Sequence, residues 1–247
     1  MFKKDPFRNY FALKRFLILS LGFFTWFRFS KFNKVRISGM ENLKGISPNK
    51  VLFVSNHQTY FAEVICMYHI FAAHKNGIYN KLPFPWYLFN PKVRLYFVAA
   101  VETMKAGIIP KLFAYAGSIS IKRTWRESGK NVNRKVDLKD ISNIGKALDS
   151  GWVITFPQGT TTPFVPGRRG TAHIIKKYNP IVVPIAIDGF RRAFDKRGLF
   201  LKKPNTILKV QFKTPINFSG EESNEEIMDR LMVEIEQRPI PPAVENF

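Results

Sequence analysis

The sequence predicts one α/β domain with a mainly parallel sheet covered by helices, preceded by a membrane-associating helical segment. Three observations predict this class. Short apolar runs of strand length alternate with longer segments of helix length, as in strands joined by crossover helices. The length of 247 residues suits one such domain with an appendage. An uncharged, apolar run near the N-terminus is flanked by basic residues.

That apolar run covers residues 16–27 (FLILSLGFFTWF), between Lys14-Arg15 and Arg28. As a helix it would extend about 18 Å, which is short of the roughly 30 Å hydrocarbon core. We therefore expect a helix that lies in or dips into one leaflet. The alternative is an ordinary buried helix. No small-x-small cleavage site follows the run, so a cleaved signal peptide is not expected. The expected division is 1–34 for this segment and 35–247 for the domain.

The first elements of the domain follow from apolar patterning. Residues 51–55 (VLFVS) read as a buried strand that ends in a polar loop. Residues 61–73 predict an apolar helix that stops before Asn76 and Gly77. A loop or broken helix is expected over 82–87, where Pro83 and Pro85 stand. Residues 96–101 (YFVAAV) predict the next strand.

The middle of the chain continues the alternation. Residues 108–116 predict a helix with a proline in its first turn, and 118–121 (SISI) alternate as a strand does. A basic, polar stretch over 122–139 predicts a mobile loop. Residues 138–150 then predict a helix that is closed by Gly151.

Three strands and a helix complete the series. Residues 152–156 and 207–212 predict strands, as do 181–187, where the internal Pro184 favours an edge, a strand start or a bulge. Ser223 and Glu226 have the spacing of a capping box and predict the start of a last amphipathic helix. No repeat or interdomain linker interrupts the series, which indicates a single helix-covered sheet.

The charge predicts an anionic partner. The chain has 39 Lys and Arg against 18 Asp and Glu, a formal net charge of +21. Residues 1–36 carry +8 and residues 220–247 carry −6, which leaves +19 for the body. Nucleic acid, a lipid surface or an acidic partner would satisfy such a charge. The single cysteine, Cys66, excludes a secreted module built on disulfides.

Histidine positions narrow the candidate chemistry. His57 stands in a polar loop at the end of a buried strand, where open α/β sheets place their active sites. His69 lies on an apolar helix and is expected in the core. His74 lies near a helix C-terminus, where a cation is favoured. No cluster has metal-ligand spacing, and no nucleophile elbow or phosphate-binding glycine loop is present, so we expect neither a metal nor a cofactor.

Four segments, in order, resemble the motif blocks of the membrane-associated glycerolipid acyltransferases, the lysophosphatidate acyltransferase superfamily. Residues 56–63 (NHQTYFAE) resemble Asn-His-x-Ser-x-x-Asp, and residues 117–123 (GSISIKR) resemble Gly-x-Ile-x-Ile-x-Arg. Residues 156–162 (FPQGTTT) resemble Phe-Pro-Glu-Gly-Thr-Arg-Ser, and residues 183–187 (VPIAI) resemble a Val-Pro strand. Each block alone is a weak signal, but four in register over about 35–218 are specific.

The resemblance implies an O-acyltransferase of phospholipid biosynthesis. His57 would be the general base, because a hydroxyl needs a nearby imidazole to take its proton as it attacks a thioester. A carboxylate would orient that imidazole, and Glu63 is the candidate. The acyl group would pass directly from acyl-CoA or acyl-carrier protein to a lysolipid hydroxyl, by default that of 1-acylglycerol 3-phosphate. The resemblance further implies substrate-binding roles for Asn56, Thr59, Lys122, Arg123, Gln158, Gly159, Thr160, Thr161, Arg168 and Arg169.

The blocks depart from the family pattern at three positions. Ala62 stands where the aspartate is expected, and Glu63 follows one residue late, so the loop before the helix would have to absorb the shift. Gln158 replaces a glutamate. Thr161 replaces an arginine that the family directs at the acceptor's phosphate. Compensation is expected from basic residues elsewhere, the candidates being Lys122, Arg123, Arg168 and Arg169.

Alternative functions remain open at this point. A lyso-amino-acid lipid is a second acceptor, since its headgroup lacks the phosphate that the missing arginine would bind. A lipid-binding relative without catalysis would explain the three departures together. A nucleic-acid-binding protein would use the charge, but no recognised module supports it, and we expect no nucleic-acid partner. The expected partners are membrane lipids with anionic headgroups, met at the cytoplasmic face of the cell membrane by a monotopic or peripheral protein.

Overall fold

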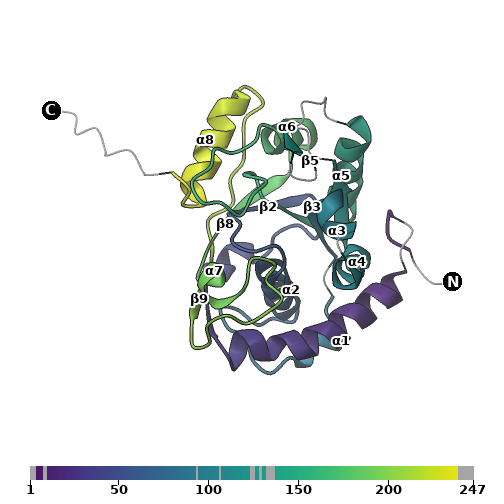
Figure 1. The fold of residues 1–247 in the computed structure, drawn as a ribbon. Coiled ribbons are helices and arrows are strands. Elements are labelled where there is room, and N and C mark those ends of the chain that lie inside the picture. Colours follow the sequence, from purple (N-terminus) through teal and green to yellow (C-terminus); the bar gives the residue numbers. More distant parts are fainter. Residues whose placement is uncertain are drawn as a thin grey trace.

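A seven-stranded sheet forms the centre of the computed structural model, which describes residues 4–7, 10–92, 94–105, 107–122, 126–127, 130–131 and 137–238. The strand order is β1-β9-β8-β2-β7-β3-β4 (Figure 1). All pairings are parallel except that of β8 with β9. The strands are β1 (Lys34–Ser38), β2 (Val51–Ser55), β3 (Leu95–Ala100), β4 (Ser118–Ile121), β7 (Trp152–Thr155), β8 (Ile181–Asp188) and β9 (Ile207–Phe212); β5 (Arg126–Glu127) and β6 (Lys130–Asn131) pair separately.

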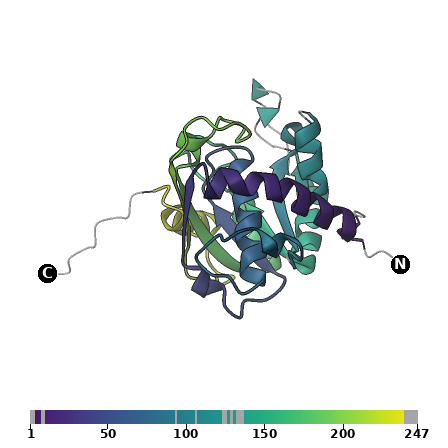
Figure 2. The same ribbon diagram turned by 90° about the horizontal axis from the view of Figure 1, so that it is seen from below.

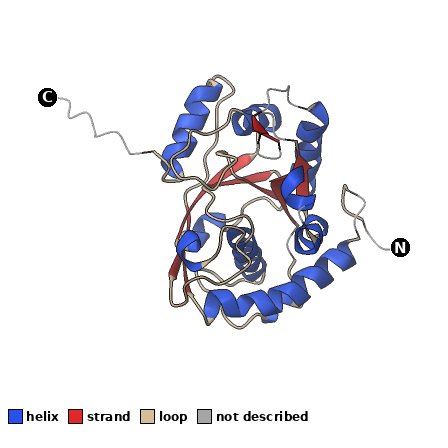
Figure 3. Cartoon of the chain, in the orientation of Figure 1, coloured by secondary structure: helices blue, strands red, loops and turns tan. Residues whose placement is uncertain are grey.

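Helices cover both faces of this sheet, as Figure 3 shows. The alternation of side chains along β2 divides the core: Val51 and Phe53 face the layer with α1 and α2, whereas Leu52 and Val54 face α5, α6 and α8. The α/β class with a mainly parallel sheet is therefore confirmed. The helices are α1 (Phe11–Ser30), α2 (Ala62–Lys75), α3 (Val101–Lys105), α4 (Ile108–Tyr115), α5 (Leu138–Ser150), α6 (Gly170–Tyr178), α7 (Phe190–Ala193) and α8 (Asn224–Glu234), with 3₁₀ turns η1 (Met40–Leu43) and η2 (Trp86–Leu88).

Helix α1 is longer than its apolar run and lies across one face of the molecule (Figure 2). One stripe packs on the body through Leu17, Gly22 and Phe29, which are buried. The opposite side leaves Phe16 and Phe24 exposed at 64% and 75%. The helix is thus neither fully buried nor detached from the domain. In the described part of the chain, no helix has the length and hydropathy to cross a bilayer.

A buried lysine anchors the first turns of α1. Lys14 is 3% exposed, and its Nζ donates to the carbonyl of Leu95 at 2.6 Å while lying 4.1 Å from the ring centroid of Tyr96. Burial lowers the pKa of Lys14 to about 7, and the charge of Asp5 acts in the opposite direction. Lys14, which the sequence places beside the apolar run as a flanking charge, is therefore part of the core.

One expectation about an individual residue was met in part, and another was wrong. Pro184 is not on an edge strand, because β8 lies at the centre of the sheet between β9 and β2, but it directly precedes the start of one ladder. It is tolerated because the ladder with β9 starts one residue later at Ile185, and its carbonyl accepts instead from Lys213 N at 2.9 Å. His74 is no cation at a helix end, since burial and, to a lesser extent, the charge of Lys75 lower its pKa to about 4.

Other expectations were met or incomplete. His69 is a core residue as predicted, hydrogen-bonded to Thr25 and Tyr87 at 3.0 Å each. The capping box at Ser223 and Glu226 opens α8 as predicted. Strand β1 and helices α6 and α7 were not predicted. Most of the basic loop expected over 122–139 falls outside the described residues.

Candidate active site

Three neighbouring strand ends create the candidate site. Strand β2 pairs in parallel with β7 on one side and with β8 on the other. The carboxyl ends of the three strands therefore meet at one edge of the sheet, which is where open α/β sheets bind ligands. His57 follows β2, the 156–162 block follows β7, and Arg191 follows β8. Segments more than 130 residues apart in the sequence are thus brought together.

His57 and Glu63 form a hydrogen-bonded pair at this edge. His57 Nδ1 lies 2.8 Å from Glu63 Oε1. The imidazole side chain is 15% exposed, whereas that of Glu63 is completely buried. The ring of His57 also stacks on Phe156, with centroids 4.1 Å apart and planes at 24°. The ring is consequently held at its Nδ1 edge and on one face.

Glu63 is held as an ionised acceptor. Its Oε1 accepts from the backbone N–H of Gln58 at 2.7 Å and of Thr59 at 2.9 Å, and its Oε2 accepts from the Thr59 hydroxyl at 2.5 Å. Burial opposes ionisation, but the hydrogen bond and charge interaction with His57 and the bonds from Thr59 outweigh it, so the pKa of Glu63 is lowered. Because a carboxylate only accepts, the bonded Nδ1 of His57 carries its hydrogen and Nε2 carries the lone pair.

The loop before α2 absorbs the one-residue shift of the carboxylate. Helix α2 begins at Ala62, so Glu63 is in its first turn and His57 precedes it. The N–H groups of Tyr60 and Phe61 donate to the carbonyls of Lys196 and Arg197, at 3.1 and 3.0 Å. This distant loop pins the connection, and the added length of a glutamate completes the reach to His57.

The two other candidates of the first block are structural. We expected Asn56 and Thr59 to contact substrate, but they are 5% and 0% exposed. The Asn56 amide exchanges two hydrogen bonds with the backbone of Ile187, at 2.9 and 2.8 Å, and so ties the ends of β2 and β8 together. Thr59 is fully engaged with Glu63 and with Ala62 N. These two residues support the pair from behind.

The third block is also partly structural. Gln158, expected to contact substrate, is 1% exposed, and its Nε2 donates to Val165 O and to Gln237 Oε1 at 3.0 Å each. Gly159 has a φ of +64°, which a glycine adopts without strain in the turn that reverses the chain here. The hydroxyl of Thr160 bonds that of Thr162 at 3.2 Å, and Thr161 lines a cavity.

The basic residues that were expected at the site lie on different elements. Lys122 ends β4, which is three strands from β2, or about 14 Å across the sheet. Arg123 lies outside the described residues. Arg168 is exposed, and its backbone N–H donates to Pro157 O. Arg169 pairs with Glu225 of α8 at 2.7 Å.

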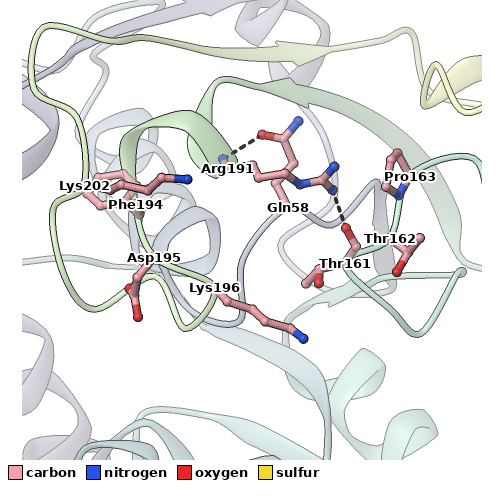
Figure 4. Close-up of a pocket in the computed structure, with 9 residues that line it drawn as sticks. All are labelled: Gln58, Thr161, Thr162, Pro163, Arg191, Phe194, Asp195, Lys196 and Lys202. Atoms are coloured by element: carbon pink, nitrogen blue, oxygen red, sulfur yellow. Dashed lines mark hydrogen bonds between the residues drawn. The ribbon is translucent and has the colours of Figure 1, made fainter.

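Arg191 is the functional candidate that the sequence reasoning missed. It belongs to α7, directly after β8, and lines a cavity together with Gln58 and Thr161 (Figure 4). The available signal was a pair of arginines three residues beyond the fourth block, at the end of a predicted strand. Among the described residues, no group of His, Cys, Asp and Glu could hold a metal ion.

Comparisons with known proteins indicate the family and the fold. A family model described as Acyltransferase matches residues 34–188. A crystal structure of the 1-acyl-sn-glycerophosphate (LPA) acyltransferase PlsC from Thermotoga maritima is similar, with a TM-score of 0.56 and 17% sequence identity. That similarity covers 90% of this chain and 77% of the other. The comparison with curated proteins gave no match.

Proposed function

The chain belongs to the acyltransferase family, and from this premise we propose that it transfers a fatty acyl group from a thioester to the hydroxyl of a lysolipid, with His57 as the general base. The observation that carries the proposal is the 2.8 Å contact between His57 and a fully buried, ionised Glu63. A carboxylate in this place holds the useful tautomer and stabilises the imidazolium that forms. A lipid-binding relative without catalysis would have no need of such a pair.

The proposed reaction is a direct transfer. The acceptor hydroxyl donates its proton to Nε2 of His57 while its oxygen attacks the thioester carbonyl. The tetrahedral intermediate then collapses, the carbon–sulfur bond breaks, and the proton on Nε2 passes to the departing thiolate. Cys66 has no part as a nucleophile in this scheme, because burial and the nearby charge of Glu63 raise the pKa of its thiol.

The donor and acceptor follow from the family resemblance. We propose acyl-CoA or acyl-carrier protein as donor, with no separate cofactor, and 1-acylglycerol 3-phosphate as acceptor. The similar Thermotoga structure is of an enzyme with that acceptor in its name, which supports the choice. A lyso-amino-acid lipid is the second candidate acceptor, since Thr161 stands where the family has an arginine.

The proposed place of action is the cytoplasmic face of the membrane, with anionic lipids as partners and without a nucleic acid. An aromatic face supports this: Phe24 of α1 is 75% exposed, and Trp86 and Phe89 beside η2 are 69% and 64% exposed. Phe23 and Phe84 join the two groups with ring centroids 6.0 Å apart. Exposed Arg15 and Lys31 stand on the same helix and its C-cap. Aromatic insertion plus attraction to headgroups is the mode of interfacial helices.

Thiol release in the presence of lysolipid vesicles tests the reaction. His57→Ala is expected to lower the rate by at least about 100-fold, the low end for loss of a general base. His173→Ala, on the exposed side of α6, is the matched control and should keep the wild-type rate. Full activity of His57→Ala would refute the mechanism. Wild-type protein that binds lysolipid but releases no thiol from either donor would establish the non-catalytic alternative.

Vesicle sedimentation tests the membrane surface. The double variant Phe24→Ser/Trp86→Ser is expected to bind anionic vesicles at least about 10-fold more weakly, because each ring contributes about 1.5–3 kcal/mol when fully buried in an apolar phase. Leu138→Ser on α5 removes an equally exposed side chain from a different surface and should leave binding unchanged. Equal losses in both variants would contradict the assignment of this face.

A further inference from the structure

A cavity of about 350 Å³ lies at the edge of the sheet that carries the His57–Glu63 pair. Its wall is built from the segments that follow β2, β7 and β8, and it includes Gln58, the neighbour of His57 (Figure 4). The Gln58 side chain bonds the carbonyl of Ile187 at 3.3 Å and the backbone N–H of Arg191 at 3.2 Å. A group bound in this cavity would therefore contact the residue that follows the proposed base.

The cavity is positively charged. Arg191, Lys196 and Lys202 line it, against one carboxylate, that of Asp195. Asp195 is occupied with its own loop, because its Oδ1 accepts from the N–H groups of Leu199 and Phe200 at 2.8 and 2.9 Å. Burial opposes its ionisation, but these backbone bonds outweigh it and lower the pKa of Asp195. One carboxylate engaged in this way leaves an excess of two cations for a ligand.

Arg191 is held in place from two sides. Its backbone N–H donates to Gln58, and its Nη2 donates to the carbonyl of Thr161. A guanidinium has five N–H donors in a planar fork, so one bond to a carbonyl leaves others for a planar or tetrahedral anion. Thr161 is the position at which the third block lacks an arginine. Arg191 of α7 thus brings a guanidinium to Thr161, whose own side chain carries no charge.

The loop that carries the two lysines is also fixed. Lys196 O accepts from Tyr60 N at 3.1 Å, and Lys202 N donates to Ala193 O at 2.8 Å. Arg28, near the end of α1, donates from Nη2 to Gly198 O at 2.9 Å. The cations therefore sit on a loop that is bonded to α1 and to the segment between His57 and α2.

We propose that this cavity binds the anionic group of the lysolipid acceptor, a phosphate monoester or a carboxylate, with Arg191 as its main contact and Lys196 and Lys202 as supporting charges. The inference rests on the proposed function and specifies its acceptor side. An acceptor fits better than a donor, because its anionic group is a few bonds from the reacting hydroxyl. The nearest phosphate of CoA, or of a carrier protein's prosthetic group, is a whole pantetheine arm away from the thioester.

Steady-state kinetics with three acceptors test the proposal: 1-acylglycerol 3-phosphate, an N-(3-hydroxyacyl) amino acid, and uncharged monoacylglycerol. Arg191→Gln is expected to raise KM for the anionic acceptor about 10–100-fold, with kcat within a few-fold and no change for monoacylglycerol. Lys196→Gln should act in the same direction more weakly. Arg192→Gln is the matched control, since Arg192 pairs with Asp188 at 2.8 Å outside the cavity lining.

A binding measurement separates this proposal from the proposed reaction. Calorimetric titration of the two anionic acceptors into His57→Ala and into His57→Ala/Arg191→Gln needs no turnover, and the second variant should bind one of them about 10–100-fold more weakly. The acceptor that loses affinity identifies the anion as phosphate or carboxylate. Unchanged affinity for both, or a rise in donor KM in Arg191→Gln, would overturn the proposal even if wild-type transfer is normal.

Discussion

Replacement of Glu63 by glutamine isolates the charge of the carboxylate from its shape. The two side chains are nearly isosteric, and an amide oxygen in the position of Oε1 would keep the bonds from His57 Nδ1 and from the N–H groups of Gln58 and Thr59. The amide nitrogen would then face the Thr59 hydroxyl, which can turn to accept. The variant should therefore fold, with a loss of no more than about 1–3 kcal/mol as charged hydrogen bonds become neutral ones.

The expected rate loss is much larger than the stability loss. A counter-charge about 4 Å from an imidazolium is worth about 4 kcal/mol at an effective dielectric constant of about 20. At about 1.36 kcal/mol per factor of ten, Glu63→Gln should lower kcat about 1,000-fold. Thiol release at saturating acceptor measures kcat, and thermal unfolding measures the fold. Glu225→Gln, at an exposed ion pair with Arg169, is the control for the same chemical change and should alter neither.

A Glu63→Gln variant that keeps more than about one-tenth of the wild-type kcat, with a normal melting temperature, would refute the role given to the carboxylate. Its stability profile provides an independent check. Because the pKa of Glu63 is lowered in the folded state, its contribution is present above pH 4.5 and is lost as the pH falls through the folded value. Wild-type protein should lose more stability below pH 4.5 than Glu63→Gln does.

Three further predictions concern the framework. Gly198→Ala should lower the free energy of unfolding, measured by chemical denaturation, by about 1–3 kcal/mol more than Gly45→Ala does. Both glycines have positive φ, but only at Gly198 would a Cβ lie 2.5 Å from the backbone at the start of α2. The free energy of unfolding of the wild-type protein should rise from pH 7 to 9, whereas that of Lys14→Met should stay constant. The reason is that the lowered pKa of Lys14 leaves the unfolded chain with more bound protons than the folded one in that range. The same pH dependence in both proteins would contradict the burial of Lys14. Gln158→Glu, which restores the family residue, should lower the melting temperature, because a carboxylate oxygen would face the acceptor oxygen of Gln237. An unchanged melting temperature would show that the hydrogen bond between these two amides does not stabilise the fold.

Much of the fold was predictable because it depends on local patterns. The short runs of β2, β4 and β9, the pattern of α5 with its closing glycine, and the capping box of α8 can each be recognised within a few residues. Strand β1 was missed although exposed Lys34 and Arg36 alternate with its apolar residues, because its first residue was assigned to the basic N-terminal segment. The central position of β8 could not be decided from the sequence, because Pro184 fits an edge, a strand start or a bulge as long as the neighbouring strands are unknown.

The candidate site was predictable only where the interacting residues lie close together in the sequence. His57 and Glu63 are six residues apart, so a loop followed by a helix could be considered from sequence alone. Asn56 and Gln158 looked like substrate contacts, but whether such a side chain faces a ligand or the core depends on Ile187 and Gln237, which are distant in the chain. Arg191 depends on β8 lying next to β2, which strand order decides.

The position of Glu63 has a consequence for how relatives of this protein are recognised. Motif searches usually fix the number of residues between histidine and carboxylate, and under that rule Ala62 marks this chain as an inactive homologue. In this chain the pair nevertheless forms, with 2.8 Å between the two atoms, and the preceding loop is hydrogen-bonded to Lys196 and Arg197. Patterns that tolerate one insertion, followed by a distance check, would retain such sequences among candidate enzymes.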